Sequence, residues 1–303
     1  MSSEGGLHFP NVFSNYNNFA EDISERARWA SERLRKIISE RYIIFHMTIR
    51  YPAVAGTFYP SQATELKNLI EQFLNQAKPP KLEGEIKALI VPHAGYIYSG
   101  PVAAYAYKLL FQTKNQPEKV ILLGPAHYIP INSASGSKTD KWQTPLGEIN
   151  VLPPLSFIAI DDTSHQPEHS LEVQLPFLQM TLKNFKILPI LINDENQSKN
   201  LADLLLPIID DKTLLVASSD LSHFYPYETA KKIDGLANKY IPNLEIKKTQ
   251  KEVGACGLAA ILVVMHLAKK LGGQGKLLKY QTSYETSGDK NSVVGYGAYV
   301  FYK

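Results

Sequence analysis

The sequence predicts an α/β protein in which helices cover both faces of a mainly parallel sheet. Three observations support this prediction. After residue 47, short apolar runs alternate with helical patterns, as in parallel sheets with crossover helices. Several runs, such as ALIV within Ile86–Val91, are continuously apolar, which is typical of strands buried on both faces. No internal repeat and no second composition regime divides these residues, so we expect a single domain.

The expected elements follow in chain order. A helix over Ala63–Gln76 precedes a Pro-rich linker, KPPK. Strands are expected at Ile86–Val91, Val120–Leu123, Glu148–Leu152, Phe185–Ile192 and Thr213–Ser218, and helices near Val102–Phe111, Ser170–Leu182, Asn200–Ile208, Glu228–Tyr240 and Gly257–Leu271. The segments LLKYQTSYE and VVGYGAYVFY read as two closing strands.

Residues 1–46 differ from the rest and are interpreted as a leader. Met1–Asn18 is rich in Ser, Asn and Gly, which predicts disorder. In Phe19–Tyr42 apolar residues recur at steps of three and four, which predicts an amphipathic helix. Its acidic residues argue against a transit peptide, and it lacks the apolar core of a secretory signal. We favour an extension outside the functional fold; the alternative is a docking helix for a partner.

Composition excludes several function classes. The 32 Lys and Arg residues against 29 Asp and Glu give a net charge of +3, too weak to indicate a nucleic-acid partner. No apolar run approaches eighteen residues, so no membrane-spanning helix is expected. The single cysteine, Cys256, excludes an internal disulfide and suits a reducing cytoplasm.

Polar, ligand-capable side chains follow three expected strands. His93 comes after Ile86–Val91, His127 follows the next run, and Asp220 and His223 follow Thr213–Ser218. Because ligands bind at the carboxyl ends of parallel strands, we expect these residues to share one metal or acid–base centre. Asp220 could orient the imidazole of His223 by a hydrogen bond.

Cys256, His169 and Glu172 are further candidates. Cys256 precedes an apolar helix, where the helix N-terminus would lower the pKa of its thiol; the alternative is a small buried hydrophobe. Glu172 has a structural explanation, because Ser170 is a plausible N-cap and an acid suits the first helical turn. His169 and Glu172 could also face the site together, as secondary pocket residues.

The candidate donors indicate a class of metal. Two histidines and a thiolate favour iron(II), copper or zinc over magnesium or calcium. Three protein ligands leave positions open for water or substrate, as in catalytic sites. HExxH, Cys-X-X-Cys, G-x-S-x-G and phosphate-binding glycine loops are missing, which argues against zincins, dithiol redox proteins, serine hydrolases and nucleotide-binding proteins.

Six motifs in order resemble the Memo family, whose bacterial and archaeal members are called AmmeMemoRadiSam system protein B. They are RYPAVAGTFYP, PHAGYIYSGP, GPAHY, HSLEVQLPFL, SSDLSHF and ACG, and the resemblance covers Thr48 to Lys303. It implies a fold like the class III extradiol dioxygenases, an αβα sandwich around a mostly parallel or mixed sheet. It also implies association with a radical SAM protein and an AMMECR1-domain protein, and for the animal member iron or copper binding, redox roles and phosphotyrosine-peptide binding.

The resemblance also implies roles for individual residues. His93 and His127 match the two metal histidines of the dioxygenases, and His223 matches their acid–base histidine. Cys256 stands where their glutamate ligand would be, and Asp220 belongs to the same pocket. Tyr96, from PHAGYIYSGP, joins the secondary pocket residues.

Three functional hypotheses follow. The first is a redox-active protein that holds iron(II) or copper on His93, His127 and Cys256. Plain ring cleavage is disfavoured, because a thiolate ligand is more easily oxidised than a carboxylate. The second is a non-catalytic module that binds a peptide or a partner protein in the crevice. The third is nucleophilic chemistry by Cys256 paired with His223.

Overall fold

The structure is a computed structural model that describes residues 25–36, 47–113 and 115–303. The chain divides into two units, Met1–Met47 and Thr48–Lys303, and each is described by itself. In the first unit, residues 25–36 are helical, within the helix predicted at Phe19–Tyr42. The rest of that range and the predicted disorder of Met1–Asn18 lie outside the described residues. Among the described helices, none combines the length and apolarity needed to cross a membrane.

The described strands form one mixed sheet. Its order is β1 (Ile49–Arg50), β5 (Lys141–Thr144), β6 (Gly147–Val151), β8 (Lys186–Ile192), β3 (Lys119–Gly124), β9 (Thr213–Ser218), β2 (Ile86–Val91), β12 (Val293–Tyr302) and β10 (His223–Tyr225). β11 (Gln274–Thr282) pairs with β12, and β4 (Ala134–Gly136) pairs with β8 and with β7 (Ala159–Ile160).

The centre of the sheet is parallel, and this positions the site. β8, β3, β9 and β2 run in the same direction, with Gly124 opposite Leu191, Leu123 opposite Ala217, and Val91 opposite Ser218. The carboxyl ends of the four strands therefore meet at one edge. The loops that carry His93, His127 and Asp220 leave the sheet from this edge.

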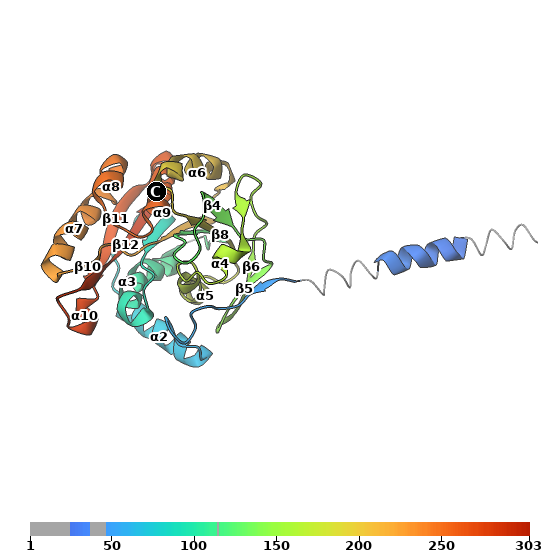
Figure 1. Ribbon diagram of the computed structural model, residues 1–303, viewed down its shortest axis with the longest axis horizontal. Coiled ribbons are helices and arrows are strands. Elements are labelled where there is room, and N and C mark those ends of the chain that lie inside the picture. Colours follow the sequence, from blue (N-terminus) through green and yellow to red (C-terminus); the bar gives the residue numbers. More distant parts are fainter. Residues whose placement is uncertain (1–24, 37–46, 114) are drawn as a thin grey trace, which may run out of the picture. The chain divides into compact units, whose positions relative to one another are not determined.

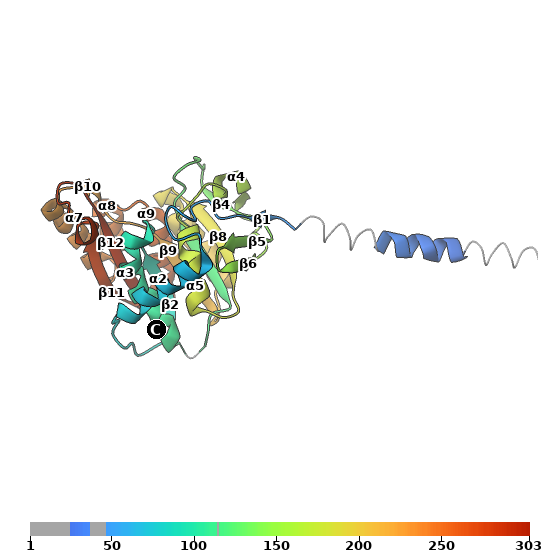
Figure 2. The same cartoon turned by 90° about the horizontal axis from the view of Figure 1, so that it is seen from below.

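Helices cover both faces of the sheet, as predicted. One apolar core contains the buried faces of α2 (Ala63–Gln76), α3 (Tyr96–Leu109) and α5 (Leu175–Thr181); the other contains those of α6 (Ser198–Leu205), α7 (Tyr227–Tyr240) and α9 (Leu258–Lys270). The shorter helices are α4 (Asp162–His165), α8 (Ile246–Glu252) and α10 (Tyr284–Ser287). Figure 2 shows α2, α3 and α5 together on one face of the sheet. Figure 1 shows the sheet between this layer of helices and the layer formed by α6, α7 and α9.

Strand side chains alternate between the two cores. Leu89 and Val91 of β2 pack into the first core, whereas Ala88 and Ile90 pack into the second. This is why the strand is apolar at successive positions and does not alternate with polar residues. The predicted αβα architecture is confirmed, and the bounds of α2, β2 and β9 agree with those predicted from the sequence.

The helix expected to begin at Val102 begins six residues earlier, at Tyr96. Pro101 lies inside it and cannot donate a hydrogen bond to the carbonyl of Ile97, four residues before. The Thr286 hydroxyl donates to that carbonyl instead (3.2 Å). Close packing against α2 also fixes this helix, because a Cβ at Gly100 would lie 2.5 Å from the Phe73 ring. The proline therefore marks no helix boundary.

The expected helix at Ser170–Leu182 is shorter and divided. It consists of a 3₁₀ turn, Glu172–Gln174, followed by α5. Ser170 is not its N-cap, because the Ser170 hydroxyl donates to the carbonyl of Pro125 (2.8 Å). The segment before the turn is thus held against the loop that carries His127.

Candidate metal centre

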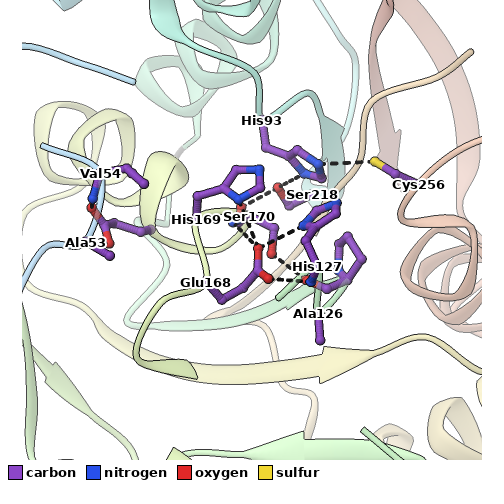
Figure 3. Close-up of polar contacts among 12 residues, drawn as sticks. Ala53, Val54, His93, Ala126, His127, Glu168, His169, Ser170, Ser218 and Cys256 are labelled. Atoms are coloured by element: carbon purple, nitrogen blue, oxygen red, sulfur yellow. Dashed lines mark hydrogen bonds and ion pairs between the residues drawn. The ribbon is translucent and has the colours of Figure 1, made fainter. Parts of the chain in front are cut away.

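Three imidazoles converge at the carboxyl edge of the parallel strands. They belong to His93 after β2, His127 after β3, and His169 before the 3₁₀ turn, and one ligand atom from each lies within 4.8 Å of the others. Figure 3 shows the three rings facing one another. His93 is 2% exposed, and the side chains of His169 and His127 are 11% and 30% exposed. The group therefore opens to solvent on the side of His127.

Hydrogen bonds fix which nitrogen of His93 carries the proton. The Ser218 hydroxyl donates its only proton to the Ser170 carbonyl (2.6 Å) and accepts a bond from the Gln174 amide (2.7 Å). It can therefore only accept from His93 Nδ1, 2.9 Å away. Nε2 of His93 is left with a free lone pair, which is the form that binds a metal.

Gln174 is itself held in one orientation. Its amide group also donates to the Pro92 carbonyl (2.9 Å), and its oxygen accepts from the Tyr107 hydroxyl (2.9 Å). A buried chain of hydrogen bonds thus runs from α3 to the His93 ring. Because every member is satisfied, the ring is oriented before any ligand binds.

Glu168 performs the corresponding task for His127. Its Oε1 lies 2.9 Å from His127 Nδ1, and its Oε2 accepts from the backbone N–H of His127. Burial would raise the pKa of this carboxyl, but the hydrogen bonds from His127 and Ser170 outweigh it and lower the pKa to about 2. The ionised carboxylate accepts from Nδ1–H, so Nε2 of His127 also keeps its lone pair.

His169 supplies the third imidazole. Its ring stacks on that of His127, with centroids 4.7 Å apart, and meets the His93 ring edge-on at 5.4 Å. Its Nδ1 is buried without a hydrogen bond, although it lies 3.3 Å from Glu168 Oε1, within ion-pair distance. This nitrogen therefore has no hydrogen-bond partner among the described residues. A buried, unpaired ring nitrogen among other imidazoles fits a site for a cation.

Burial keeps two of the imidazoles, those of His93 and His169, neutral. Burial, followed by the neighbouring histidines, holds the pKa of His93 well below its ordinary range. Burial also lowers the pKa of His169 to about 4, against an opposing effect of Glu168. At neutral pH both rings are uncharged and can offer lone pairs. The residues present therefore fit a transition-metal ion, for which neutral imidazole is a common ligand.

Cys256 lies beside this group. Its sulfur is 3.1 Å from His93 Nε2 and accepts from the backbone N–H of Asp220 (3.2 Å). Burial, with the nearby Asp220 carboxyl, raises the pKa of the thiol to about 12, which favours the buried small hydrophobe over the thiolate, the other alternative for this cysteine. The sulfur lies beside His93, as the metal-ligand hypothesis expects, and not beside His223, its partner in the nucleophile hypothesis. In the metal-free protein the thiol therefore donates to His93 Nε2.

Gly257 allows this approach of the cysteine. A Cβ there would lie 2.5 Å from the Ser218 carbonyl oxygen and 2.8 Å from the Ser219 Cβ. The backbone is thus closely packed at Gly257, whereas nothing lies within 4 Å of a Cβ built at Gly254. α9 begins at Leu258, with Gly257 as its N-cap.

Asp220 and His223 reach the same edge without the predicted bond between them. Asp220 Oδ1 accepts from the backbone N–H of His93 (2.7 Å), so it orients the His93 loop. Burial raises the pKa of Asp220 to about 7. The pKa of His223 is lowered by burial and then by His127, against a hydrogen bond to the Leu221 carbonyl. His223 is therefore close enough to the group to sense its charge.

The two remaining secondary candidates are structural. The Glu172 carboxylate accepts from Arg50 Nη1 (2.7 Å), the Tyr59 hydroxyl (2.6 Å), and the backbone N–H groups of Ala53 and Val54. It has no lone pair to spare for a metal. Tyr96 is 2% exposed and donates to the Val173 carbonyl, so it belongs to the core.

Arg50 connects this carboxylate to the site. Besides its ion pair with Glu172, Arg50 donates through Nε to the His165 carbonyl and through Nη2 to the Glu168 carbonyl. Both side chains of the pair are almost completely buried. The pair therefore fixes the backbone that carries Glu168 and His169. Arg50 and Glu172 therefore position the site and take no part in its chemistry.

Two of the residues at this site, His169 and Glu168, have little in the sequence to mark them as part of a metal centre. His169 was a secondary candidate, and Glu168 was not singled out. The available signal was local: in EHS an acid stands directly beside a histidine. Which ring that acid would serve depends on the fold, since its hydrogen-bonded partner is His127, forty-one positions away.

Two large cavities lie elsewhere. One, of about 690 Å³, is lined by Ile86 and Thr213 at the starts of β2 and β9; another, of about 860 Å³, is lined by Lys119 and Lys186 at the starts of β3 and β8. Both are therefore at the amino edge of the sheet, opposite the histidines. Neither is lined by histidine or cysteine, so we assign the chemistry to the carboxyl edge.

Comparison with known proteins gives consistent results. A family model described as Memo-like protein matches residues 50–300. A MEMO1 family protein of Sulfolobus acidocaldarius is 40% identical over 279 residues, covering 82% of this chain and 97% of that protein. One of Nitrosopumilus maritimus is 39% identical over 276 residues, covering 84% and 99%. A solved structure of an uncharacterized protein from Escherichia coli K12 aligns with 71% of this chain over its own full length, at 11% identity and a TM-score of 0.39.

Proposed function

This chain belongs to the Memo family, and on that premise we propose that it binds one redox-active transition-metal ion, iron(II) or copper, at His93, His127 and His169. One observation carries the proposal: ligand atoms of these three side chains lie within 4.8 Å of one another. Their local bonds support it, because Nδ1–H of His93 and of His127 is engaged and Nε2 of each is left as a donor.

The donor set favours these metals. Imidazole suits iron, copper, zinc and nickel, whereas magnesium and calcium prefer oxygen ligands. Zinc would fit the same donors as an ion without redox chemistry. Cys256 could provide a further, sulfur donor, but its thiol would first have to lose a proton whose pKa is raised to about 12. We therefore assign the three histidines as the primary ligands.

The chain's own groups can hold and move protons around the bound ion, which would itself supply one-electron chemistry at its open positions. Burial lowers the pKa of His223, so this ring is neutral at pH 7 and can accept a proton. The Asp220 carboxyl, with a pKa raised to about 7, can exist in either form at that pH. We assign His223 as the acid–base group and Asp220 as its neighbour that orients the His93 loop.

The test is an anaerobic metal titration of the full chain. We expect iron(II) or copper to bind near one equivalent. Alanine substitutions at His93, His127 or His169 should each weaken binding by at least tenfold. His266→Ala is the matched control, because His266 lies on α9 and outside the group. Equal binding by all four variants would contradict the proposal.

Redox activity requires its own measurement. The protein with iron or copper bound should show a reversible one-electron reduction. This signal should be absent from His127→Ala, because that variant no longer holds the metal. If the protein binds only zinc under competition with iron(II) and copper, the redox part of the proposal fails and the metal site remains.

A further inference from the structure

One buried carboxylate contacts two of the three imidazoles. Glu168 Oε1 lies 2.9 Å from His127 Nδ1 and 3.3 Å from His169 Nδ1. Glu168 is 1% exposed, so this negative charge lies in the interior directly behind the ligand group. Figure 3 shows the carboxylate beneath both rings. Neither the motifs nor the functional assignment above requires an acid at this position.

The contacts require the carboxylate to carry no proton. Oε1 accepts from the backbone N–H of Ser170 (2.8 Å) as well as from His127 Nδ1, and Oε2 accepts from the backbone N–H of His127. All three partners are N–H donors when His127 is in its Nδ1–H form. A glutamine amide at this position would turn its NH₂ group toward one of these donors and leave it without an acceptor. The site is therefore built for glutamate and not for its amide.

The surrounding fold holds the carboxylate in place. Arg50 Nη2 donates to the Glu168 carbonyl (2.6 Å), and Ser170, two residues later, is bonded to the carbonyl of Pro125 in the His127 loop. Backbone on both sides of the side chain is thus fixed. This arrangement leaves Glu168 little freedom to move away from either ring.

We propose that Glu168 is a positioning residue that fixes His127 as its Nδ1–H form, with Nε2 free for a metal, and that places its charge beside His169. The proposal rests on the proposed metal site and deepens it. One charge placed behind two neutral ligands also offsets part of the charge of a divalent cation. Removal of such a partner behind a metal-bound histidine commonly costs 10- to 100-fold in metal affinity.

Two measurements on the full chain test the proposal. The first is a ¹H–¹⁵N spectrum of the histidine side chains without metal, which reports which ring nitrogen carries the proton. We expect His127 as the Nδ1–H form in the wild type and a mixture with the Nε2–H form in Glu168→Gln. The second is a titration with Co²⁺ alone, in which Glu168→Gln should bind about 10- to 100-fold more weakly. Glu148→Gln, which removes an exposed acid paired with Lys141, is the matched control and should change neither result.

The outcomes separate the two proposals. If wild-type His127 is in the Nε2–H form, or if the wild type binds Co²⁺ and Glu168→Gln binds it equally tightly, the positioning role is wrong. The wild-type spectrum decides the first point even where Glu168→Gln fails to fold. If the wild type binds no Co²⁺ but Glu168→Gln still shifts the His127 proton, the metal site fails and the positioning role stands.

Discussion

The Cys256 sulfur lies 3.1 Å from Nε2 of His93, the ring nitrogen that the Ser218 hydroxyl leaves free. Because burial keeps the thiol protonated, this contact is a hydrogen bond from S–H to the lone pair of the imidazole. A cation that binds His93 Nε2 must break this hydrogen bond, because both use the same lone pair. Metal binding and the state of the cysteine are therefore coupled through one nitrogen atom.

Replacement of Cys256 by alanine is expected to change Co²⁺ affinity by less than about threefold. The three imidazoles remain in this variant, and the competing S–H bond to His93 is lost. A sulfur ligand would instead have to be deprotonated from a thiol whose pKa is about 12. A titration of Cys256→Ala beside His169→Ala measures this. A loss on the order of 100-fold in Cys256→Ala, with His169→Ala unaffected, would make sulfur the third ligand.

The Cys256 thiol is expected to react slowly with iodoacetamide in the folded, metal-free protein. Only the thiolate reacts, and a pKa raised to about 12 leaves very little of it at pH 7. The rate should rise about tenfold per pH unit from pH 7 to 10 without a plateau. The urea-unfolded chain serves as the control and should react with an ordinary thiol pKa. A plateau near pH 8 in the folded protein would contradict the burial argument.

Asp220 is expected to make the metal-free protein less stable as the pH rises from about 4 to about 7. Its folded-state pKa of about 7 lies above the unfolded value near 3.9, so the folded state binds more protons in this range. The stabilisation from the protonated Asp220 carboxyl is complete below its unfolded-state pKa and is lost as the pH rises through its folded-state pKa. The total is at most about 4 kcal/mol. Urea unfolding of Asp220→Asn, which keeps an oxygen for the His93 N–H, should lack this decline.

If the wild type and Asp220→Asn lose stability equally over that pH range, Asp220 is not the titrating group. His223→Gln provides a second comparison at the same edge. Because the pKa of His223 is lowered, its contribution has the opposite sign: the folded state resists its protonation, and stability falls as the solution becomes more acidic.

Glu172→Gln is expected to destabilise the protein by about 3–5 kcal/mol, since it leaves Arg50 buried without its charged partner. The exposed pair of Lys141 and Glu148 is the comparison, and Glu148→Gln should cost about 0–1 kcal/mol. Denaturant unfolding of both variants measures the difference. Similar costs for the two would mean that the Arg50–Glu172 pair does not hold the interior together.

The central architecture could be predicted from the sequence because strand and helix signals there are strong. β2 and β9 each contain a run of four apolar residues, ALIV and LLVA, and their ends are marked by Pro92 and by the polar residues from Ser218 onward. β1, β4, β7 and β10, of two or three residues each, were not predicted. Strands so short have no pattern of their own, because pairing with a neighbour defines them.

The candidate site was predictable in part. His93 and His127 follow buried strands, and the shared edge of parallel strands brings them together. The third imidazole depends on how the loop before α5 folds back, and Arg50, from a distant part of the chain, fixes that loop through its bonds to the His165 and Glu168 carbonyls and its ion pair with Glu172. For a similar reason the sequence could not show whether the pKa of the Cys256 thiol is lowered or raised. Position next to a helix N-terminus can be read from sequence, but depth of burial cannot, and burial has the larger effect here.

Anomalous diffraction from crystals loaded anaerobically with iron(II) tests the central claim most directly. The account predicts one strong peak at the iron edge, within coordination distance of a ring nitrogen of each of His93, His127 and His169. No such peak, or a peak coordinated elsewhere on the chain, would contradict it.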